Sequence, residues 1–534
     1  MNTLHLKAEE PGAVSTAAKL LREGRVVAIP TETVYGLAAN ALDPEAVKRI
    51  FEAKGRPQDN PLIVHVASLD EIEPLVSEIP DSLYRLAEKF WPGPLTVIMK
   101  KSAAVPDAVT AGLDTVAIRM PSHPVARQII KESALPLAAP SANASGMPSP
   151  TSAAHVINDL EGRIDAVIDG GECEVGVEST VISLVKNPPV LLRPGGISPQ
   201  SLEEVLGKIE ISHAVFEKLE AGEKPLSPGM KYKHYSPRAK VTLIKGDFEK
   251  YKDFLEAQKY ETCAVCFEGE GKHFRTAVEY GRRGDCDDQA EHIFAALREV
   301  DETGCEYAFV RFPDTEGVGL AVYNRLLRSA AFRVIDLDFK IPVYGLTGQT
   351  GAGKSTIAQM FAENGFCVAD TDVLAREAVK NSEVIAELCE YFGADIFEGG
   401  ELNRRELAKR AFVSPGKTAL LNKATHPEIT RLAFEAIHSG EKAGAKAAII
   451  DAPVIFESAI TSVCKKIVCV TAPLEERIKR IALRDSITPE ETAARMSAQK
   501  DEEYYIKHSD VIIENTDTET ARQAVMKFVK EEIQ

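Results

Sequence analysis

A glycine-rich segment near the middle of the chain is the sequence feature that most constrains the fold. Residues 345–356 read Gly-Leu-Thr-Gly-Gln-Thr-Gly-Ala-Gly-Lys-Ser-Thr and fit the phosphate-binding pattern of a glycine, four free positions, and Gly-Lys-Ser or Gly-Lys-Thr. The apolar run 341–346 before it indicates a strand, and the amphipathic run 355–363 after it indicates a helix. A strand, a loop and a helix in this order are the context that the motif needs.

The chemistry of the motif explains its residue types. Triphosphate oxygens must be met by backbone N–H groups that converge from a tight loop at the positive end of the following helix. Lys354 supplies a mobile positive charge to the outer phosphates, and the hydroxyl of Ser355 suits a Mg²⁺ ligand. The sequence therefore predicts an ATP-binding loop that uses Mg²⁺ as cofactor. It is formed by Gly351, Ala352, Gly353, Lys354, Ser355 and Thr356.

The position of this loop also divides the chain. In such folds the loop follows the first strand of its domain, so the residues before 341 belong to other domains. A chain of 534 residues is too long for one core. We expect an α/β multidomain protein with a linker rich in proline and glycine in its middle. The expected segments are 1–224, the linker 225–239, 240–337 and 342–534.

The composition of the chain indicates the compartment and the classes of partner that suit it. The net charge of −17 argues against tight, nonspecific nucleic-acid binding, so nucleotide substrates need local cations. Nine cysteines without framework spacing fit a reducing compartment, and the close pair Cys263 and Cys266 lies in an apolar run typical of a buried strand. The sequence has no apolar run of about 18 residues, and segment 1–12 carries acids where a signal peptide needs an apolar core. We therefore expect a cytoplasmic protein that does not contact membranes.

Polar segments follow several predicted strands in the first part of the chain. The strand 25–29 ends in the polar loop 30–36, and α/β folds bind ligands at such strand ends. Lys54 and Arg56 flank a glycine in a later loop, where they form either an anion clamp or a solvated surface. Three further polar segments can each be a site or a plain turn. They lie at residues 119–121, 140–146 and 193–196.

Taken together, these segments resemble the L-threonylcarbamoyladenylate synthase family over residues 1 to about 337. The matching segments occur in the family's order at residues 30–36, 54–61, 119–121, 140–146, 176–180 and 192–195. The resemblance implies a mixed, twisted α/β domain that condenses L-threonine, bicarbonate and ATP into threonylcarbamoyl-AMP and releases pyrophosphate. The product would pass to the tRNA threonylcarbamoyl transfer machinery, which modifies an adenosine next to the anticodon.

The same resemblance implies site residues. Those expected on the threonine side are Thr33, His65, Arg119, Ser141 and Ser179. Those expected to hold ATP are Lys54, Arg56, Asn60, Thr115, Asn143, Thr151 and Arg193. The cations make physical sense, because Lys54 and Arg56 can neutralise a triphosphate and Arg119 can pair with a carboxylate through its planar fork. None of these residues has the character of a covalent nucleophile, so positioning and charge stabilisation are the expected means of catalysis.

Two further segments extend the resemblance to the long-form synthases. In those enzymes the linker folds over the active site. Here, residues 225–239 are therefore either a spacer or a lid that excludes water, and in a lid Tyr235 would reach the nucleotide. Residues 240–337 alternate predicted strands and helices and indicate a small, Rossmann-like parallel α/β layer. They resemble the accessory C-terminal domain of the long-form enzymes, and their sequence shows no group of residues typical of a catalytic or binding site.

Carboxylates follow two predicted strands in the last part of the chain. The strand 366–369 ends in a segment that contains Asp370 and Asp372, beside the expected phosphates. Capping of the next helix suits Asp370, whereas Asp372 can orient an attacking hydroxyl or bind Mg²⁺ through water. Asp451 ends a later strand and is a candidate metal carboxylate, together with Ser355.

Residues 342–534 resemble dephospho-CoA kinase throughout. The matching segments are residues 345–356, 370–376, 426–427, 453–457, 483–485 and 510–515. This implies a P-loop domain with a parallel sheet and a helical lid, which transfers the ATP γ-phosphate to the ribose 3'-hydroxyl of dephospho-CoA. Asp372 would be the base or orienter, and Lys354 with Mg²⁺ would stabilise the transferring group. The lid would carry arginines to the phosphates, with Arg484 as a catalytic candidate beside Arg477, Arg480 and Arg495.

The sequence therefore favours a bifunctional enzyme with two separate ATP sites and no shared intermediate. A second hypothesis makes the first half an RNA-binding module fused to an active kinase, because related folds bind duplex RNA. It predicts steeply salt-dependent binding, against which the acidic balance counts. A third hypothesis, an inactive scaffold, is disfavoured by the presence of Lys354, Ser355, Arg56 and Ser141. Direct contact with tRNA is left open.

Overall fold

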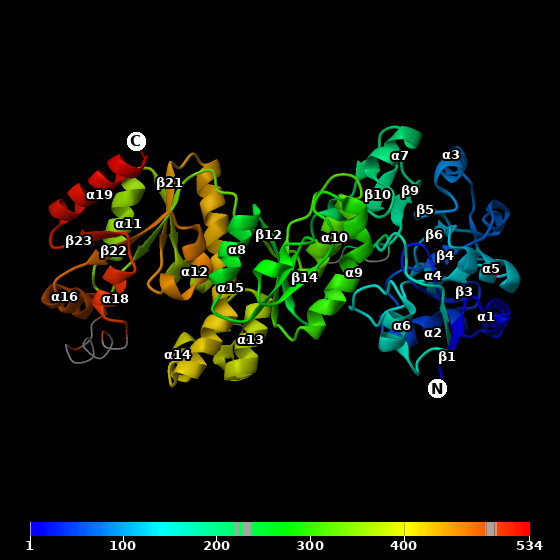
Figure 1. Cartoon of the computed structure of the whole chain (residues 1–534), viewed down its shortest axis with the longest axis horizontal. Coiled ribbons are helices and arrows are strands. Elements are labelled where there is room, and N and C mark those ends of the chain that lie inside the picture. Colours follow the sequence, from blue (N-terminus) through cyan, green and yellow to red (C-terminus); the bar gives the residue numbers. More distant parts are fainter. Residues whose placement is uncertain are drawn as a thin grey trace. The chain divides into compact units, whose positions relative to one another are not determined.

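The chain folds into α/β layers (Figure 1), as the sequence predicts. The computed structural model describes residues 2–218, 223, 225–227, 236–399, 401–485, 488, 496 and 499–533, without the side chains of 398, 484 and 485. The chain forms two compact units. The first comprises residues 1–243 and 261–334, and the second comprises 244–260 and 335–534. None of the described helices combines the length and the apolar character that crossing a bilayer requires.

A mixed sheet forms the first part of the first unit, where eleven strands pair among the described residues. Its helices are α1 (Ala13–Arg22), α2 (Pro44–Lys54), α3 (Asp81–Phe90), α4 (Asp107–Thr110), α5 (Pro124–Ser133), α6 (Ala153–Leu160) and α7 (Pro199–Leu206). In spatial order the strands are β1 (Leu4–Lys7), β8 (Ala166–Asp169), β2 (Val27–Ile29), β3 (Gly36–Asn40), β7 (Leu137–Ala138), β4 (Ile63–His65), β6 (Thr115–Arg119), β5 (Leu95–Lys100), β9 (Thr180–Ser183), β10 (Val190–Arg193) and β11 (Glu210–Ile211).

The pairing of these strands gathers the polar segments at one edge. β4 and β6 run parallel, with His65 opposite Arg119 as the last residue of each strand. Strand β9, which follows Ser179, runs parallel to β5. An isolated bridge joins Gly36 to Ser141 and ties the loop after β7 to the start of β3. Since the carboxyl ends of parallel strands meet at one edge, this register brings side chains from distant segments together.

Helix α2 shows how local sequence sets the position of a site residue. Its N-terminus is capped by Asp43, whose side chain accepts a hydrogen bond from the N–H of Glu45 at 3.0 Å. Gly55 then ends the helix in the left-handed conformation, with a φ of 62°, which glycine adopts without strain. The apolar side chains of Val47, Ile50 and other residues on one face are buried. Lys54 is therefore the last residue of a packed helix.

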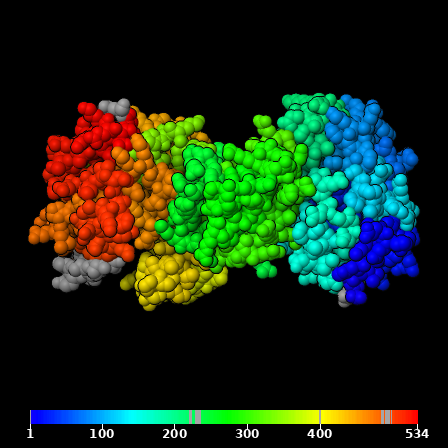
Figure 2. All heavy atoms as spheres, viewed as in Figure 1, coloured from blue at the N-terminus to red at the C-terminus, as the bar shows by residue number. Residues whose placement is uncertain are grey.

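A second sheet follows in the chain, and we call it and its helices α9 and α10 the accessory layer. Its strand order is β14 (Ala277–Glu279), β13 (Thr262–Cys266), β15 (Tyr307–Arg311), β12 (Lys240–Lys245) and β16 (Val334–Asp336). β13 is parallel to both β14 and β15. Its helices are α9 (Cys286–Glu302) and α10 (Gly319–Ser329), whereas α8 (Phe248–Glu256) belongs to the second unit. Cys263 and Cys266 are buried in β13, as expected. The atoms of residues 261–334 are drawn in green in Figure 2.

The last sheet belongs to the second unit and is parallel throughout its described pairs. Its order is β18 (Phe366–Asp370), β21 (Ala447–Asp451), β17 (Val343–Thr347), β22 (Lys466–Thr471) and β23 (Val511–Glu514). The predicted strand and helix around the phosphate-binding loop are β17 and α11 (Lys354–Glu363). The other described helices are α12 (Thr371–Ala378), α13 (Ser382–Phe392), α14 (Arg404–Ala411), α15 (Pro415–Lys442), α16 (Leu474–Asp485), α18 (Glu502–Lys507) and α19 (Thr518–Ile533).

Candidate active sites

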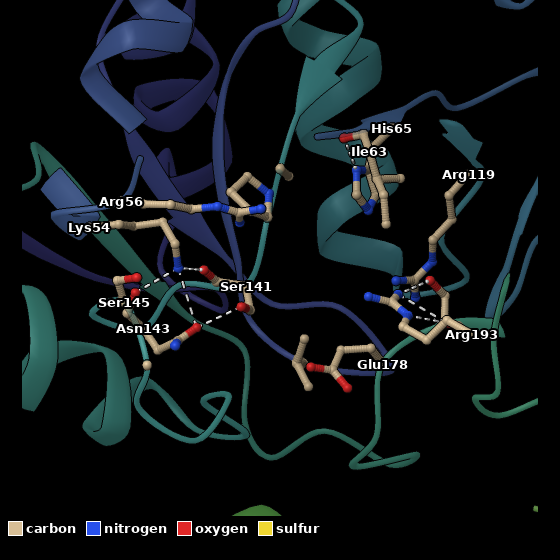
Figure 3. Close-up of a pocket in the computed structure, with 15 residues that line it drawn as sticks. Lys54, Arg56, Ile63, His65, Arg119, Ser141, Asn143, Ser145, Glu178 and Arg193 are labelled. Atoms are coloured by element: carbon tan, nitrogen blue, oxygen red, sulfur yellow. Dashed lines mark hydrogen bonds between the residues drawn. The ribbon is translucent and has the colours of Figure 1, made fainter. Parts of the chain in front are cut away.

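A pocket opens at the edge of the first sheet where the polar segments meet (Figure 3). The space between its walls, open mouth included, is about 650 Å³. Eight of the residues that the sequence analysis selected line it, together with Val34 and Glu178. These eight are Lys54, Arg56, His65, Arg119, Ser141, Asn143, Ser179 and Arg193. The pocket thus combines cations, hydroxyls and one amide, which suits an anionic, polar ligand.

Lys54 holds one wall of this pocket. Its ammonium group is buried and donates to the backbone oxygens of Ser141 and Asn143, the second at 2.6 Å, and to the Asn143 Oδ1 at 3.3 Å. Burial lowers the pKa of Lys54 well below its usual value, and the charge of Arg56 lowers it further. Lys54 is therefore not a solvated surface cation. Its hydrogen bonds fix the loop 140–146, while Arg56 lies beside it in the pocket.

The loop after β7 is further held by its own side chains. The Ser141 hydroxyl donates to the Asn143 Oδ1 at 2.6 Å. The amide nitrogen of Asn143 donates to the backbone oxygens of Ala144 at 2.8 Å and Met147 at 2.7 Å. These bonds leave Ser141 and Asn143 in fixed positions on the pocket wall.

Arg119 forms a buried ion pair with a carboxylate that the sequence analysis did not single out. Its Nη2 lies 2.8 Å from the Glu32 Oε1, and both side chains are about 5% exposed or less. Burial raises the pKa of Glu32, but the charge and hydrogen bond of Arg119 outweigh this and bring it below its usual value. The Nε of Arg119 is buried without a hydrogen-bond acceptor among the described residues. One donor of a charged guanidinium thus remains for a ligand carboxylate.

His65 lies beside Arg119 at the end of β4 and is neutral. Burial, together with the nearby charge of Arg119, lowers its pKa to about 3. Its Nδ1 lies 3.3 Å from the backbone oxygen of Ile63. A neutral imidazole in this place can donate or accept one hydrogen bond without adding charge to the pocket.

Ser179 and Arg193 form the opposite wall. The Arg193 guanidinium donates to the Ser179 backbone oxygen at 3.1 Å from Nε and 3.0 Å from Nη2, and to the Ser179 Oγ at 3.1 Å. The Ser179 Oγ also lies 2.8 Å from the Thr96 Oγ1. The sequence analysis did not select Glu178, which precedes Ser179 and lines the pocket. Its signal was available, because Glu178 lies in the segment 176–180 that resembles the synthase family.

Five selected residues are not among those that line the pocket. Thr33 is buried, with its hydroxyl 3.0 Å from that of Thr31. Asn60 is fully buried, and both of its amide atoms are without a hydrogen-bond partner in the described part of the chain. Thr115 begins β6 opposite Lys100, at the other end from Arg119. The two remaining cases are Thr151, whose Oγ1 lies 3.4 Å from the His155 Nδ1, and Tyr235, which lies outside the described residues.

The phosphate-binding loop forms the second candidate site. Gly348, Gly351 and Gly353 all have a positive φ, and a Cβ at Gly348 would lie 2.3 Å from the Val470 backbone oxygen. The Lys354 Nζ donates to the Gly348 oxygen at 3.0 Å, across the mouth of the loop. Both Ser355 and Thr356 are exposed at the start of α11. Ala352 is buried beneath the loop. This is an amide-lined anion site at a helix N-terminus.

Arginines of α16 support this loop from one side. Arg477 donates from Nε to the Thr350 oxygen at 3.4 Å and from Nη1 to the Glu502 Oε2 at 2.8 Å. Arg480 donates from Nη1 to the Ala352 oxygen at 3.3 Å. The side chain of Arg484 lies outside the described residues, as does Arg495.

Three carboxylates stand at the ends of β18 and β21 near the loop. Asp370 caps α12 by accepting from the N–H groups of Asp372 at 2.9 Å and Val373 at 3.1 Å, as the sequence analysis favoured. Asp372 is exposed. Asp451 is buried, and its Oδ1 has no hydrogen-bond partner among the described atoms. Burial raises the pKa of Asp451 to about 6, against the lowering effect of Lys354 and with an added effect of the two other carboxylates.

An unpartnered, buried carboxylate oxygen is the kind of ligand that a hard cation prefers. Ser355 offers a hydroxyl oxygen at the start of α11. No group of three or more His, Cys, Asp or Glu side chains among the described residues forms a metal site by itself. Asp451 and Ser355 therefore fit Mg²⁺ only in combination with ligands from a phosphate group.

Comparison with known proteins separates the chain into three matched segments. Residues 19–195 match a family described as "Telomere recombination", residues 197–331 match "Threonylcarbamoyl-AMP synthase, C-terminal domain", and residues 342–520 match "Dephospho-CoA kinase". Threonylcarbamoyl-AMP synthase of Pyrococcus abyssi is 49% identical over 331 residues, which are 61% of this chain and 96% of that protein.

Two further relatives each match one part of the chain. Dephospho-CoA kinase of Corynebacterium glutamicum is 36% identical over 176 residues, which are 33% of this chain and 88% of that protein. A crystal structure of P. abyssi Sua5 complexed with L-threonine is similar with a TM-score of 0.59 and 45% identity, covering 63% of this chain and 99% of that one. The synthase part and the kinase part of the chain thus each match an almost complete enzyme.

Proposed function

Since the chain belongs to the threonylcarbamoyl-AMP synthase family and, through its second half, to the dephospho-CoA kinase family, it is a bifunctional enzyme, and we propose the substrates and site residues of both reactions. The first site condenses L-threonine, bicarbonate and ATP into threonylcarbamoyl-AMP and pyrophosphate. The second transfers the γ-phosphate of ATP to the 3'-hydroxyl of dephospho-CoA. The adenylate passes to the tRNA threonylcarbamoyl transfer machinery.

The observation that carries the proposal for the first site is the Nε of Arg119, which has no acceptor among the described residues and lies in a pocket of hydroxyls and cations. Arg119 pairs with the threonine carboxylate while Glu32 holds its other edge. His65, Ser141 and Ser179 lie around it and suit the amino and hydroxyl groups of threonine. A bound L-threonine in the related P. abyssi structure supports this assignment.

ATP occupies the cationic remainder of the same pocket. Arg56 and Arg193 neutralise the triphosphate, and Asn143 lies in the same pocket beside Ser141. Lys54 acts indirectly, because its ammonium group is engaged by the loop that carries Ser141 and Asn143. Of the other selected residues, Thr33, Asn60, Thr115 and Thr151 are assigned to substrate binding by family resemblance alone, as is Tyr235.

The kinase site is carried by the phosphate-binding loop. Lys354 reaches across it toward the outer phosphates, and Asp372 is exposed at the start of α12, where it can orient the 3'-hydroxyl and take its proton. Ser355 and Asp451 would hold Mg²⁺. When bound, this ion neutralises charge on the transferring phosphate. Arg484 is proposed to reach the same phosphates from α16.

Substrate omission tests both reactions in the full chain. Pyrophosphate release is expected to require L-threonine, bicarbonate and ATP together, with label from isotopic bicarbonate recovered in an adenylate. CoA formation is expected to require dephospho-CoA and ATP with Mg²⁺, and to proceed without threonine. Release of pyrophosphate that is indifferent to threonine, or steeply salt-dependent binding of duplex RNA with no adenylate formed, would contradict the proposal for the first site.

A further inference from the structure

The accessory layer shares its hydrophobic core with the wall of the synthase pocket. Val34 and Val177 belong to the first sheet's loops, yet both are buried in one cluster with Val265, Phe294 and other side chains of the accessory layer. Val34 also lines the pocket. One side of the pocket wall is therefore supported by apolar contacts from a part of the fold to which no chemistry has been assigned.

The backbone at Gly176, next to Val177, approaches helix α9 closely. A Cβ at Gly176 would lie 2.3 Å from the backbone oxygen of Ala290 and 2.3 Å from the Cα of Glu291. Gly176 also has a φ of 71°, in the left-handed region. The segment that leads into Glu178 and Ser179 is thus seated directly on α9.

Arg325 of helix α10 reaches Glu178 on the pocket wall. Its side chain is fully buried, and its Nε donates to the Glu178 Oε2 at 2.5 Å. Its Nη2 donates to the backbone oxygen of Pro194 at 2.9 Å. Burial raises the pKa of Glu178, but the charge of Arg325, followed by that of Arg193, brings it down to about 2. One guanidinium therefore joins the two segments that carry Ser179 and Arg193.

Arg298 of helix α9 acts on the opposite wall in the same way. Its Nη1 and Nη2 each donate to the Asp159 carboxylate at 2.9 Å, and its Nη2 also donates to the Pro148 oxygen. The Asp159 Oδ2 in turn accepts from the N–H of Ala144 at 3.2 Å. Ala144 follows Asn143 in the loop that Lys54 holds. A second buried arginine, which is bidentate with its carboxylate, thus supports the other pocket loop.

We propose that Arg298 and Arg325 are positioning residues of the synthase site, and that the accessory layer completes the pocket by fixing its two loops. The proposal rests on the synthase function proposed above. Each arginine comes from a different helix. Arg325 pairs with Glu178 on one pocket loop, and Arg298 pairs with Asp159 of helix α6, which holds the other loop through the N–H of Ala144. Their loss leaves Glu178 or Asp159 buried without its hydrogen-bonded arginine, so the pocket loop that depends on that carboxylate has to move.

The test replaces each arginine in the full chain and compares it with a matched control. The variants are Arg325→Met, Arg298→Met and the conservative Arg325→Lys. The control is Arg311→Met, since Arg311 is equally buried and pairs with Glu270 at 3.2 Å inside the accessory layer, away from the pocket residues. Amide hydrogen exchange of residues 140–151 and 174–196 measures loop position directly. The KM values for ATP and threonine measure its consequence.

Arg325→Met is expected to accelerate exchange in 174–196 at least fivefold and to raise the KM for ATP at least tenfold. Arg298→Met has the same effect on 140–151, and Arg325→Lys falls between wild type and Arg325→Met. Arg311→Met lowers the melting temperature but changes neither KM more than twofold. CoA formation stays unchanged in all four variants.

Equal exchange and equal KM values in Arg325→Met, Arg298→Met and Arg311→Met would overturn the proposal, because the arginines would then only hold the layer in place. A wild-type chain without threonine-dependent pyrophosphate release would instead overturn the proposed function. The exchange measurement would still decide whether the arginines fix the loops.

Discussion

Asn515 donates from Nδ2 to the backbone oxygen of Ala352 at 2.8 Å, although 163 residues separate the two in the chain. It follows the last strand of the kinase sheet and reaches under the phosphate-binding loop. The approach is so close that a Cβ at Gly353 would lie 2.0 Å from the Asn515 Nδ2. The loop's shape thus depends on a side chain from the far end of the chain as well as on its own glycines.

Replacing Asn515 by alanine is expected to lower kcat/KM for CoA formation about tenfold, because the buried carbonyl of Ala352 loses its best donor. Asn364→Ala is the control. Asn364 makes an equivalent amide bond, at 2.8 Å to the Met360 oxygen, at the other end of α11. Steady-state kinetics of dephospho-CoA phosphorylation measures the effect. Equal losses in the two variants would show that the Asn515 bond contributes only to general stability.

Lys54→Met is expected to impair the synthase without removing any direct ligand contact. The oxygens of Ser141 and Asn143 lose a buried donor, which costs about 1–3 kcal/mol of stability. Lys48→Met is the control, since Lys48 lies on the same helix but is exposed, 3.9 Å from Glu52. Calorimetry and threonine-dependent pyrophosphate release measure both variants. Unchanged melting with lost ATP binding would mean that Lys54 contacts phosphate directly.

The local parts of the fold were predictable because their signals are local. The spacing of Gly348, Gly353 and Lys354 predicts a strand, a loop and a helix, and β17 and α11 have these positions. The short strand β3 was missed, since Gly36 to Asn40 carries small residues without alternation and is held by pairing with β2 and β7. Strands of this kind are set by their neighbours rather than by their own sequence.

Gly176→Ala tests the close contact with helix α9. Its Cβ would overlap backbone atoms of Ala290 and Glu291, so a loss of at least about 3 kcal/mol is expected from overlap and backbone strain together. Gly112→Ala is the control, with a similar φ of 75° and no atom within 4 Å of its Cβ, and it should cost only about 1 kcal/mol. Chemical denaturation compares them. Equal losses would show that the contact with α9 is not tight in solution.

The Arg325–Glu178 pair makes the stability of the first unit depend on pH. The pKa of Glu178 is lowered to about 2 in the folded chain, from its usual 4.5. As the pH falls, Glu178 therefore binds a proton in the unfolded chain before it does so in the folded chain. The stabilisation by the ion pair is complete above pH 4.5 and is lost below it.

The melting temperature of Glu178→Gln should accordingly lie furthest below wild type near pH 7 and approach it as the pH falls toward 3. The control is Glu204→Gln, which removes an exposed ion pair with Lys89 and should show only a small difference. A gap that stays constant for Glu178→Gln from pH 7 to pH 3 would contradict the lowered pKa.

The candidate site was predictable in its residue types but not in its connections. Lys54 and Arg56 are neighbours in sequence, yet Lys54 is occupied by carbonyls from a loop almost ninety positions away, as its bond to Ser141 spans 87 residues. Glu178 and Arg325 are 147 residues apart and pair only because α10 packs on that side. No spacing rule links such residues, because their meeting depends on how separate layers pack.

The central claim is that the chain has two independent nucleotide sites, and reciprocal variants test it most directly. Lys354→Ala and Arg119→Ala are assayed side by side for CoA formation and for threonine- and bicarbonate-dependent pyrophosphate release. The account predicts that Lys354→Ala abolishes the first activity and keeps the second, and that Arg119→Ala does the reverse. Loss of both activities in either correctly folded variant would contradict it.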